Sequence, residues 1–96
     1  STSRRQRQMC IRDSHILIVT NKPIPSVSQV EPEDEQMMGH LFIVARKIAE
    51  DLGVSESGYR LIVNVGKNGC QEVPHIHMHL LAGGYLGGFG FPNDKI

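Results

Sequence analysis

Three of the five histidines stand at alternate positions near the C-terminal end of the chain, in the stretch His75-Ile76-His77-Met78-His79. A spacing of two is the period of a β-strand, in which successive side chains point to opposite faces. The pattern therefore predicts a strand that turns all three imidazoles to one face. The apolar residues between them are expected to point to the other face and to bury against a core.

The same spacing makes a metal site the second interpretation. Alternate residues on one strand face lie about 6.5–7 Å apart at the backbone, so His75 and His79 are about 13 Å apart. Two neighbouring imidazoles can share an ion, but three in a row do not easily converge on one. The motif also contains no acidic residue and the chain has no Cys-x-x-Cys pair. A nucleophile flanked by hydrogen-bonding imidazoles fits better, and a metal-binding module using His75 and His77 stays as a distant alternative.

Length and composition indicate one small domain. The chain has 96 residues, 40% of them hydrophobic, and a formal net charge of zero, so it is not an obvious binder of polyanions. Two cysteines are too few for a secreted disulfide framework and suggest a reducing compartment. No apolar run approaches the length of a membrane span, and the start lacks a signal-peptide core. We therefore expect a cytoplasmic protein without a membrane partner.

Charge is unevenly distributed along the chain. Residues 1–12 carry four arginines and no acidic residue, whereas the remainder has six Lys and Arg against ten Asp and Glu. The first segment has no hydrophobic period and no aromatic residue that would stack on bases, so nucleic acid is not an expected partner. We interpret residues 1–12 as a disordered or foreign leader. One domain then covers residues 13–96, with a glycine-rich tail from residue 83.

Hydrophobic patterning predicts two more strands and one helix. The continuous apolar run His15–Thr20 is typical of a central strand, and Tyr59–Val65 forms another. Between them, the acidic and proline-containing segment 31–35 opens a helix with one apolar stripe, and Gly53 is its expected end. The pair Asn68-Gly69 predicts a hairpin turn between the last two strands.

The residues around the histidines resemble a known family. His75-x-His77-x-His79 followed by two leucines is similar to the His-x-His-x-His-apolar-apolar signature of the histidine-triad (HIT) superfamily. The flanking segments 58–64 and 69–73 more specifically resemble bacterial Hint proteins, the purine nucleoside phosphoramidases. The resemblance runs from about His15 to Gly84. It implies an α+β fold in which one main helix packs on an antiparallel sheet.

The resemblance also implies a chemistry and the histidines that perform it. We expect a hydrolase that cleaves the P–N or a related bond of purine nucleoside 5′-monophosphate derivatives through a nucleotidyl-histidine intermediate, without metal or cofactor. By resemblance, His77 is the nucleophile and His79 assists the leaving group. His75 and His15 would orient the row. The helix of Hint proteins contributes to a dimer interface, so a homodimer is expected.

Four further positions are expected to hold the nucleotide phosphate by the same resemblance. Asn64 would contact it directly, and backbone N–H groups of Cys70, Gln71 and Glu72 would turn toward its oxygens. Cys70 stands where Hint proteins usually have a glycine. If its backbone has a positive φ, a cysteine is a strained fit there.

The chain departs from the Hint pattern at both ends. Hint proteins normally start with a hairpin, a short helix and a loop that form most of the purine and ribose pocket. Residues 1–12 resemble none of these, so we expect a fold shortened at its N-terminus. After Gly84, the aromatic residues Tyr85, Phe89 and Phe91 either fold back over the site or belong to a mobile tail. The alternative function is therefore a poorly active nucleotide-binding or dimeric scaffold protein of HIT type.

Overall fold

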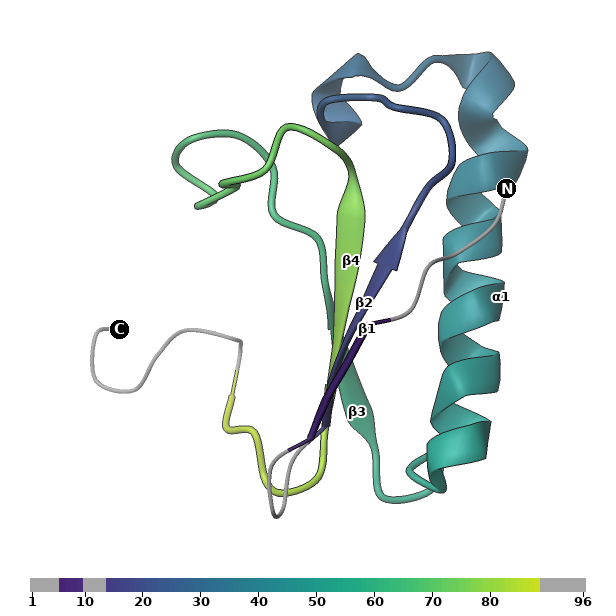
Figure 1. Cartoon of the computed structure of the whole chain (residues 1–96), viewed down its shortest axis with the longest axis vertical. Helices are drawn as coiled ribbons and strands as arrows, with labels where there is room; N and C mark the ends of the chain where they lie inside the picture. The colour runs from purple at the N-terminus through teal and green to yellow at the C-terminus, as the bar shows by residue number, and fades with distance from the viewer. Residues whose placement is uncertain (1–5, 10–13, 89–96) are drawn as a thin grey trace.

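The computed structural model of the chain describes residues 6–9 and 14–88. Four strands form an antiparallel sheet in the order β1-β2-β4-β3, and one long helix lies along one face of it (Figure 1). These elements are β1 (Gln6–Met9), β2 (Ser14–Val19), α1 (Glu35–Leu52), β3 (Tyr59–Ile62) and β4 (His77–Ala82). The predicted α+β class, an antiparallel sheet with one main helix packed on it, is confirmed.

The pairing of β2 with β4 forms the middle of the sheet. Its register sets Val19 opposite His77 and Leu17 opposite His79. The other edge of β2 pairs with β1, and the other edge of β4 pairs with β3. The prediction of a central strand at His15–Thr20 is therefore confirmed within one residue at each end.

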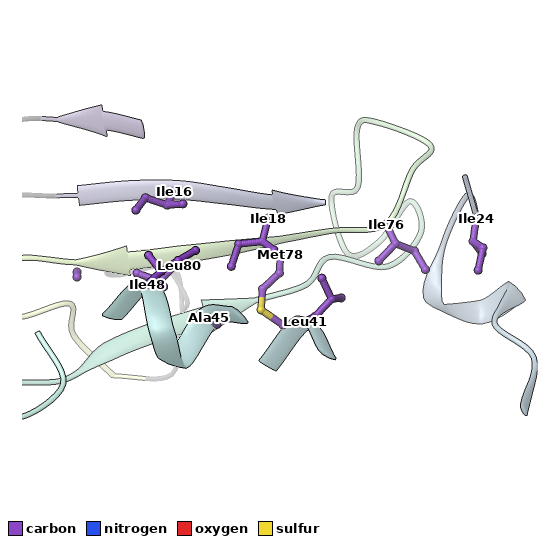
Figure 2. Packing of buried hydrophobic residues seen from close by; sticks show 10 residues of the cluster. Ile16, Ile18, Ile24, Leu41, Ala45, Ile48, Ile76, Met78 and Leu80 are labelled. Atoms are coloured by element: carbon purple, nitrogen blue, oxygen red, sulfur yellow. The ribbon is translucent and has the colours of Figure 1, made fainter. Parts of the chain in front are cut away.

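Strict alternation along these two strands buries one face under α1. Four side chains of this face have no exposed surface: Ile16, Ile18, Met78 and Leu80. The helix meets them with Leu41, Ala45 and Ile48, which recur at steps of four and three residues (Figure 2). Each large apolar side chain buried in this way contributes about 1.5–3 kcal/mol relative to an exposed one. This layer anchors the sheet and leaves the opposite face available.

The helix begins one short turn later than the sequence predicted. Residues Pro32–Asp34 form a 3-10 turn, and the α-helix starts at Glu35. Its end at Gly53 agrees with the prediction, because this glycine has a φ of 75°, a left-handed conformation that suits a residue without Cβ. Within the described ranges, no helix is both long and apolar enough to cross a bilayer.

An ion pair ties the loop after β2 to the start of the helix. The Asp34 carboxylate is 5% exposed and accepts a hydrogen bond of 2.6 Å from Lys22 Nζ. It also accepts one of 2.9 Å from the backbone N–H of Glu31. These two donors, Lys22 first, hold the pKa of Asp34 below its ordinary value. The loop between β2 and the helix is thereby held at both ends.

Four residues of the segment interpreted as a leader pair with the sheet. Gln6–Met9 form β1 and pair with β2, with Gln8 opposite His15. An edge of β2 offers unpaired backbone N–H and C=O groups, and an extended segment of almost any composition can satisfy them. Residues 1–5 and 10–13 lie outside the described part of the chain.

The connection between β3 and β4 corrects the hairpin prediction. Asn68 and Gly69 do occupy the centre of a turn, in which the Cys70 N–H donates to Lys67 O at 3.0 Å. However, neither has a positive φ, and tight two-residue hairpins require turns with positive φ. Strand β3 therefore ends at Ile62, and β4 begins only at His77. Residues 63–76 between them form a long loop.

Two adjacent positions in this loop both favour glycine, but only one of them has it. A Cβ on Gly69 would lie 2.4 Å from the carbonyl oxygen of Val65, so only glycine fits there. Cys70 has a φ of 63°, the strained conformation that was expected if its backbone turned left-handed.

We predict that Cys70→Gly stabilises the protein. Glycine adopts a positive φ without a Cβ clash, and relief of this strain is of order 1 kcal/mol. For a domain of this size that corresponds to a rise in Tm of roughly 4–8 °C. Thermal unfolding followed by circular dichroism measures it. Cys70→Ala is the matched control, because it removes the thiol but keeps the Cβ, and an equal gain in that variant would contradict a strain mechanism.

Candidate functional site

The histidines gather on the face of the sheet that α1 does not cover. His77 and His79 alternate with buried residues of β4 and remain partly exposed. The loop between β3 and β4 and the chain that follows β4 both lie on this side of the sheet (Figure 1). The site is thus formed by the central strands and bordered by irregular segments.

Three imidazoles form a contiguous cluster across β2 and β4. His15 Nε2 lies 2.9 Å from His79 Nδ1, with ring centroids 5.1 Å apart. His77 meets His79 edge to face, with centroids 5.0 Å apart and planes at 74°. In a hydrogen bond between two imidazoles, one nitrogen carries the proton and the other offers its lone pair. One of His15 and His79 therefore donates and the other accepts. The strand register brings His15 to this place from a distant segment of the sequence.

The tautomer of His77 follows from its hydrogen bond. Its Nδ1 lies 2.7 Å from the backbone carbonyl oxygen of His75. A carbonyl only accepts, so Nδ1 must carry the proton. In the neutral ring, Nε2 then holds the free lone pair.

The sequence pattern predicts His75 in the same strand as His77 and His79, but the strand begins at His77. His75 lies before β4, and its N–H donates to Val73 O at 2.8 Å rather than to the β-ladder. Its Nε2 donates to the backbone carbonyl of Thr20 at 2.9 Å. The ring is therefore anchored at the end of β2, whereas the carbonyl of the same residue holds His77.

Thr20 was not singled out from the sequence. It is 2% exposed, and its hydroxyl donates to Lys22 O at 2.9 Å and lies 3.3 Å from His75 Nε2. The only sequence signal was a polar residue at the end of an apolar strand, which more often marks a turn than a partner for a ring 55 residues away.

The environment of His79 disfavours its charged form. Burial is the largest cause, followed by the like charges that His77 and then His15 would carry. Together they lower the pKa of His79 from its ordinary value of 6.5. The imidazole nearest to the centre of the cluster is thus kept neutral at physiological pH.

Asn64 lies just beyond the end of β3 and is partly buried. In the β3–β4 register Ile62 stands opposite His79. The pairing of β3 with β4 ends there, and Asn64 follows β3 two residues later. The role of Asn64 as a phosphate ligand stays a prediction.

The three loop residues predicted to bind phosphate are placed less directly. The Cys70 N–H donates to Lys67 O and the Gln71 N–H to Gly66 O, both at 3.0 Å, so these two groups are engaged within the turn. The side chains of Cys70, Gln71 and Glu72 line a hollow with Pro25, Ser26 and Gln29, and no histidine lines this hollow. The loop borders the histidine cluster without joining it.

Arg60 fixes the start of the glycine-rich tail. Its guanidinium donates to Leu86 O at 3.2 Å and to the carbonyl of Gly87. Tyr85 is 96% exposed and does not fold back over the site. Phe89 and Phe91, for which the same question was raised, lie outside the described residues.

Metal ligands do not converge in the described part of the chain. Among residues 14–88, no three His, Cys, Asp or Glu side chains are arranged to hold an ion. The Nε2 of His75 is engaged by the backbone carbonyl of Thr20.

Comparison with known proteins identifies the family. Residues 8–85 match the HIT domain. The chain belongs to the HIT domain family. Purine nucleoside phosphoramidases of Escherichia coli K12 and of Shigella flexneri are each 55% identical to it over 74 residues. The match covers 77% of this chain and 62% of those proteins, so the chain spans less than two thirds of their length.

Solved structures of HIT proteins share the fold. A HIT family hydrolase from Legionella pneumophila has a TM-score of 0.76 at 32% identity, over 91% of this chain and 87% of that protein. A HIT family hydrolase from Clostridium thermocellum has a TM-score of 0.77 at 31% identity, over 95% and 88%. The HIT family and the resemblance to purine nucleoside phosphoramidase, both predicted from the histidine motif and its flanks, are confirmed.

The lowered pKa of His79 predicts a pH-dependent stability. In the unfolded chain the group returns to about its ordinary pKa. As pH falls below about 6.5, the unfolded state therefore binds more protons than the folded state, and the free energy of unfolding decreases. Urea unfolding between about pH 8 and pH 5 measures this slope. His79→Gln should flatten it, whereas the exposed His40→Gln on α1 should not; an unchanged slope in His79→Gln would contradict the assignment.

Proposed function

We propose that this HIT protein is a hydrolase acting on the P–N bond, or a related bond, of purine nucleoside 5′-monophosphate derivatives through a nucleotidyl-histidine intermediate. The observation that carries the proposal is the His77 ring, whose Nδ1–H is bound to the His75 carbonyl. Its Nε2 is left with a free lone pair on the face of the sheet that α1 does not cover. The substrate class is suggested by similarity to purine nucleoside phosphoramidases.

In the first step, the Nε2 lone pair of His77 attacks the α-phosphorus. A bond forms between this nitrogen and phosphorus, and the bond from phosphorus to the leaving nitrogen breaks. A neutral imidazole is a competent nucleophile near pH 7. The leaving amine takes up a proton from solvent, which the attacking water returns in the second step, and the enzyme keeps the nucleotidyl group on His77 Nε2.

His79 and His15 support this step from the adjacent strand positions. The two rings are joined through His15 Nε2 and His79 Nδ1, which fixes the orientation of the His79 ring beside His77. From there His79 assists the leaving group as a hydrogen-bond donor. In the second step water attacks phosphorus, the bond to His77 breaks, and the nucleoside monophosphate leaves with the imidazole regenerated.

Asn64 and the loop stabilise charge on the phosphate oxygens in this scheme. Asn64 follows β3, the strand that pairs with the histidine strand β4, and its amide provides a donor. Of the three N–H groups assigned from the sequence, that of Glu72 is proposed as the loop donor, since those of Cys70 and Gln71 donate within the turn. We assign no step to a metal or a cofactor. A cytoplasmic location is proposed because Cys70 is a free, exposed thiol, which a reducing compartment preserves.

The test is hydrolysis of adenosine 5′-phosphoramidate in the presence of EDTA by the wild-type chain and by His77→Ala. Wild-type turnover should survive the chelator. The variant should lose at least about 10³-fold in kcat, because the attacking atom is removed. Trapping a denatured protein that carries labelled AMP after a rapid quench would identify the intermediate directly.

Other results would favour the alternatives. Saturable AMP binding without turnover, in a chain shown to be folded, would indicate a nucleotide-binding or scaffold protein. Activity that EDTA abolishes and zinc restores would overturn the metal-free scheme. Equal turnover in His77→Ala and wild type would exclude His77 as the nucleophile.

We also propose that the chain forms a homodimer, as the Hint resemblance implies. Phe42 and Ile43 of α1 are 56% and 46% exposed, an unusual exposure for large apolar side chains on one helix turn. The outer edge of β3 is also unpaired among the described strands.

Sedimentation velocity tests the dimer. Wild type should sediment at twice the chain mass, and Phe42→Glu should shift the population toward monomer, because a buried unpaired carboxylate is unfavourable at an apolar interface. Arg46→Glu on the same helix is the control for charge. A wild-type monomer at all concentrations would contradict the dimer.

A further inference from the structure

The side chain of Gln71 holds three backbone groups from three places in the chain. Its Oε1 accepts a hydrogen bond of 2.9 Å from the Gly66 N–H. Its Nε2 donates to Pro25 O at 2.6 Å and to Val73 O at 2.9 Å. The backbone N–H of Gln71 also donates to Gly66 O at 3.0 Å, so this residue closes the turn from both sides.

The chemistry of these partners determines the orientation of the amide. One partner is an N–H group and must face the amide oxygen, whereas the other two are carbonyls and must face the amide nitrogen. Exchanging the two ends would set oxygen against oxygen twice. Only an amide of this length satisfies all three groups, because a carboxylate has no donor and Asn is one methylene shorter.

The bonds of Gln71 lead directly to the histidines. Val73 O accepts from both Gln71 Nε2 and the His75 N–H. The carbonyl of His75 in turn holds Nδ1 of His77. The Pro25 contact is next to a second link between the same segments, in which the Ile76 N–H donates to Ile24 O at 2.9 Å. Gln71 therefore sits two hydrogen bonds away from the group that sets the His77 tautomer.

We propose that Gln71 is a positioning residue for the nucleophile. By clamping the turn at Gly66 and the loop at Pro25 onto Val73, it fixes the lead-in to β4 and thus the His75 carbonyl. That carbonyl keeps the proton of His77 on Nδ1 and the lone pair on Nε2. The expected loss of kcat rests on the proposed function, whereas the effect of Gln71 on the His77 tautomer does not depend on it.

The experiment compares Gln71→Glu and Gln71→Met with a matched control, Gln29→Glu. Glutamate is isosteric but turns an oxygen toward the two carbonyls, and methionine keeps the length without any hydrogen bond. Gln29 is exposed and lines the same hollow, so Gln29→Glu adds the same charge there without touching the clamp. Circular dichroism identifies the variants that remain folded, and methionine serves where glutamate unfolds the chain.

Two readouts separate positioning from general stability. In the first, ¹⁵N NMR of the His77 ring should show one tautomer, protonated on Nδ1, in wild type and in Gln29→Glu. In folded Gln71 variants it should show a mixture of tautomers. In the second, kcat should fall by about 10- to 100-fold with KM changed by less than about threefold, as expected for a misplaced nucleophile.

The outcomes are distinguishable from those of the proposed function. If wild type has no phosphoramidase activity, the proposed function fails, while the ¹⁵N spectra still decide whether Gln71 positions His77. An unchanged His77 tautomer in both folded Gln71 variants would overturn the inference. Equal losses in Gln29→Glu and Gln71→Glu would also overturn it, because charge in the hollow would then explain the effect.

Discussion

The antiparallel register of β2 and β4 is the constraint on which the other features depend. It sets His79 opposite Leu17 and His15 opposite Leu81, so that two histidines 64 residues apart approach to 2.9 Å. A slip of one residue would turn the histidines into the core and the apolar residues into solvent, because side chains alternate with a period of two. Burial of the β2 and β4 side chains under α1 thus fixes the geometry of the opposite face.

Local rules are obeyed in the scaffold and violated in the loop beside the site. The strands alternate, the helix carries one apolar stripe, and its last residue is followed by a left-handed glycine. In residues 63–76, by contrast, Cys70 has a positive φ, and both the oxygen and the nitrogen of the Gln71 side-chain amide bond to backbone groups. Such departures concentrate where a chain must hold an irregular shape against a functional surface.

Much of the site was predictable from the motif, and the remainder depended on long-range contacts. The alternation placed His77 and His79 on one face without any structural information. It also predicted His75 in the same strand, whereas the strand begins at His77, because Ile24 O and Thr20 O accept hydrogen bonds from Ile76 and His75 before it. The role of His15 came only from family resemblance, since nothing in a lone histidine at the start of a strand indicates a partner in another strand.

The sequence by itself determined the elements whose cause is local. These are the period of β4 and the apolar stripe and glycine stop of α1. Tertiary structure decided which polar atoms meet. The His77 tautomer, the anchoring of His75 at Thr20 and the clamp made by Gln71 all join residues to backbone groups whose positions depend on the packed fold. Hydrophobic periodicity specifies which face is buried, but a hydrogen bond is specified only when both of its partners have been brought within about 3 Å.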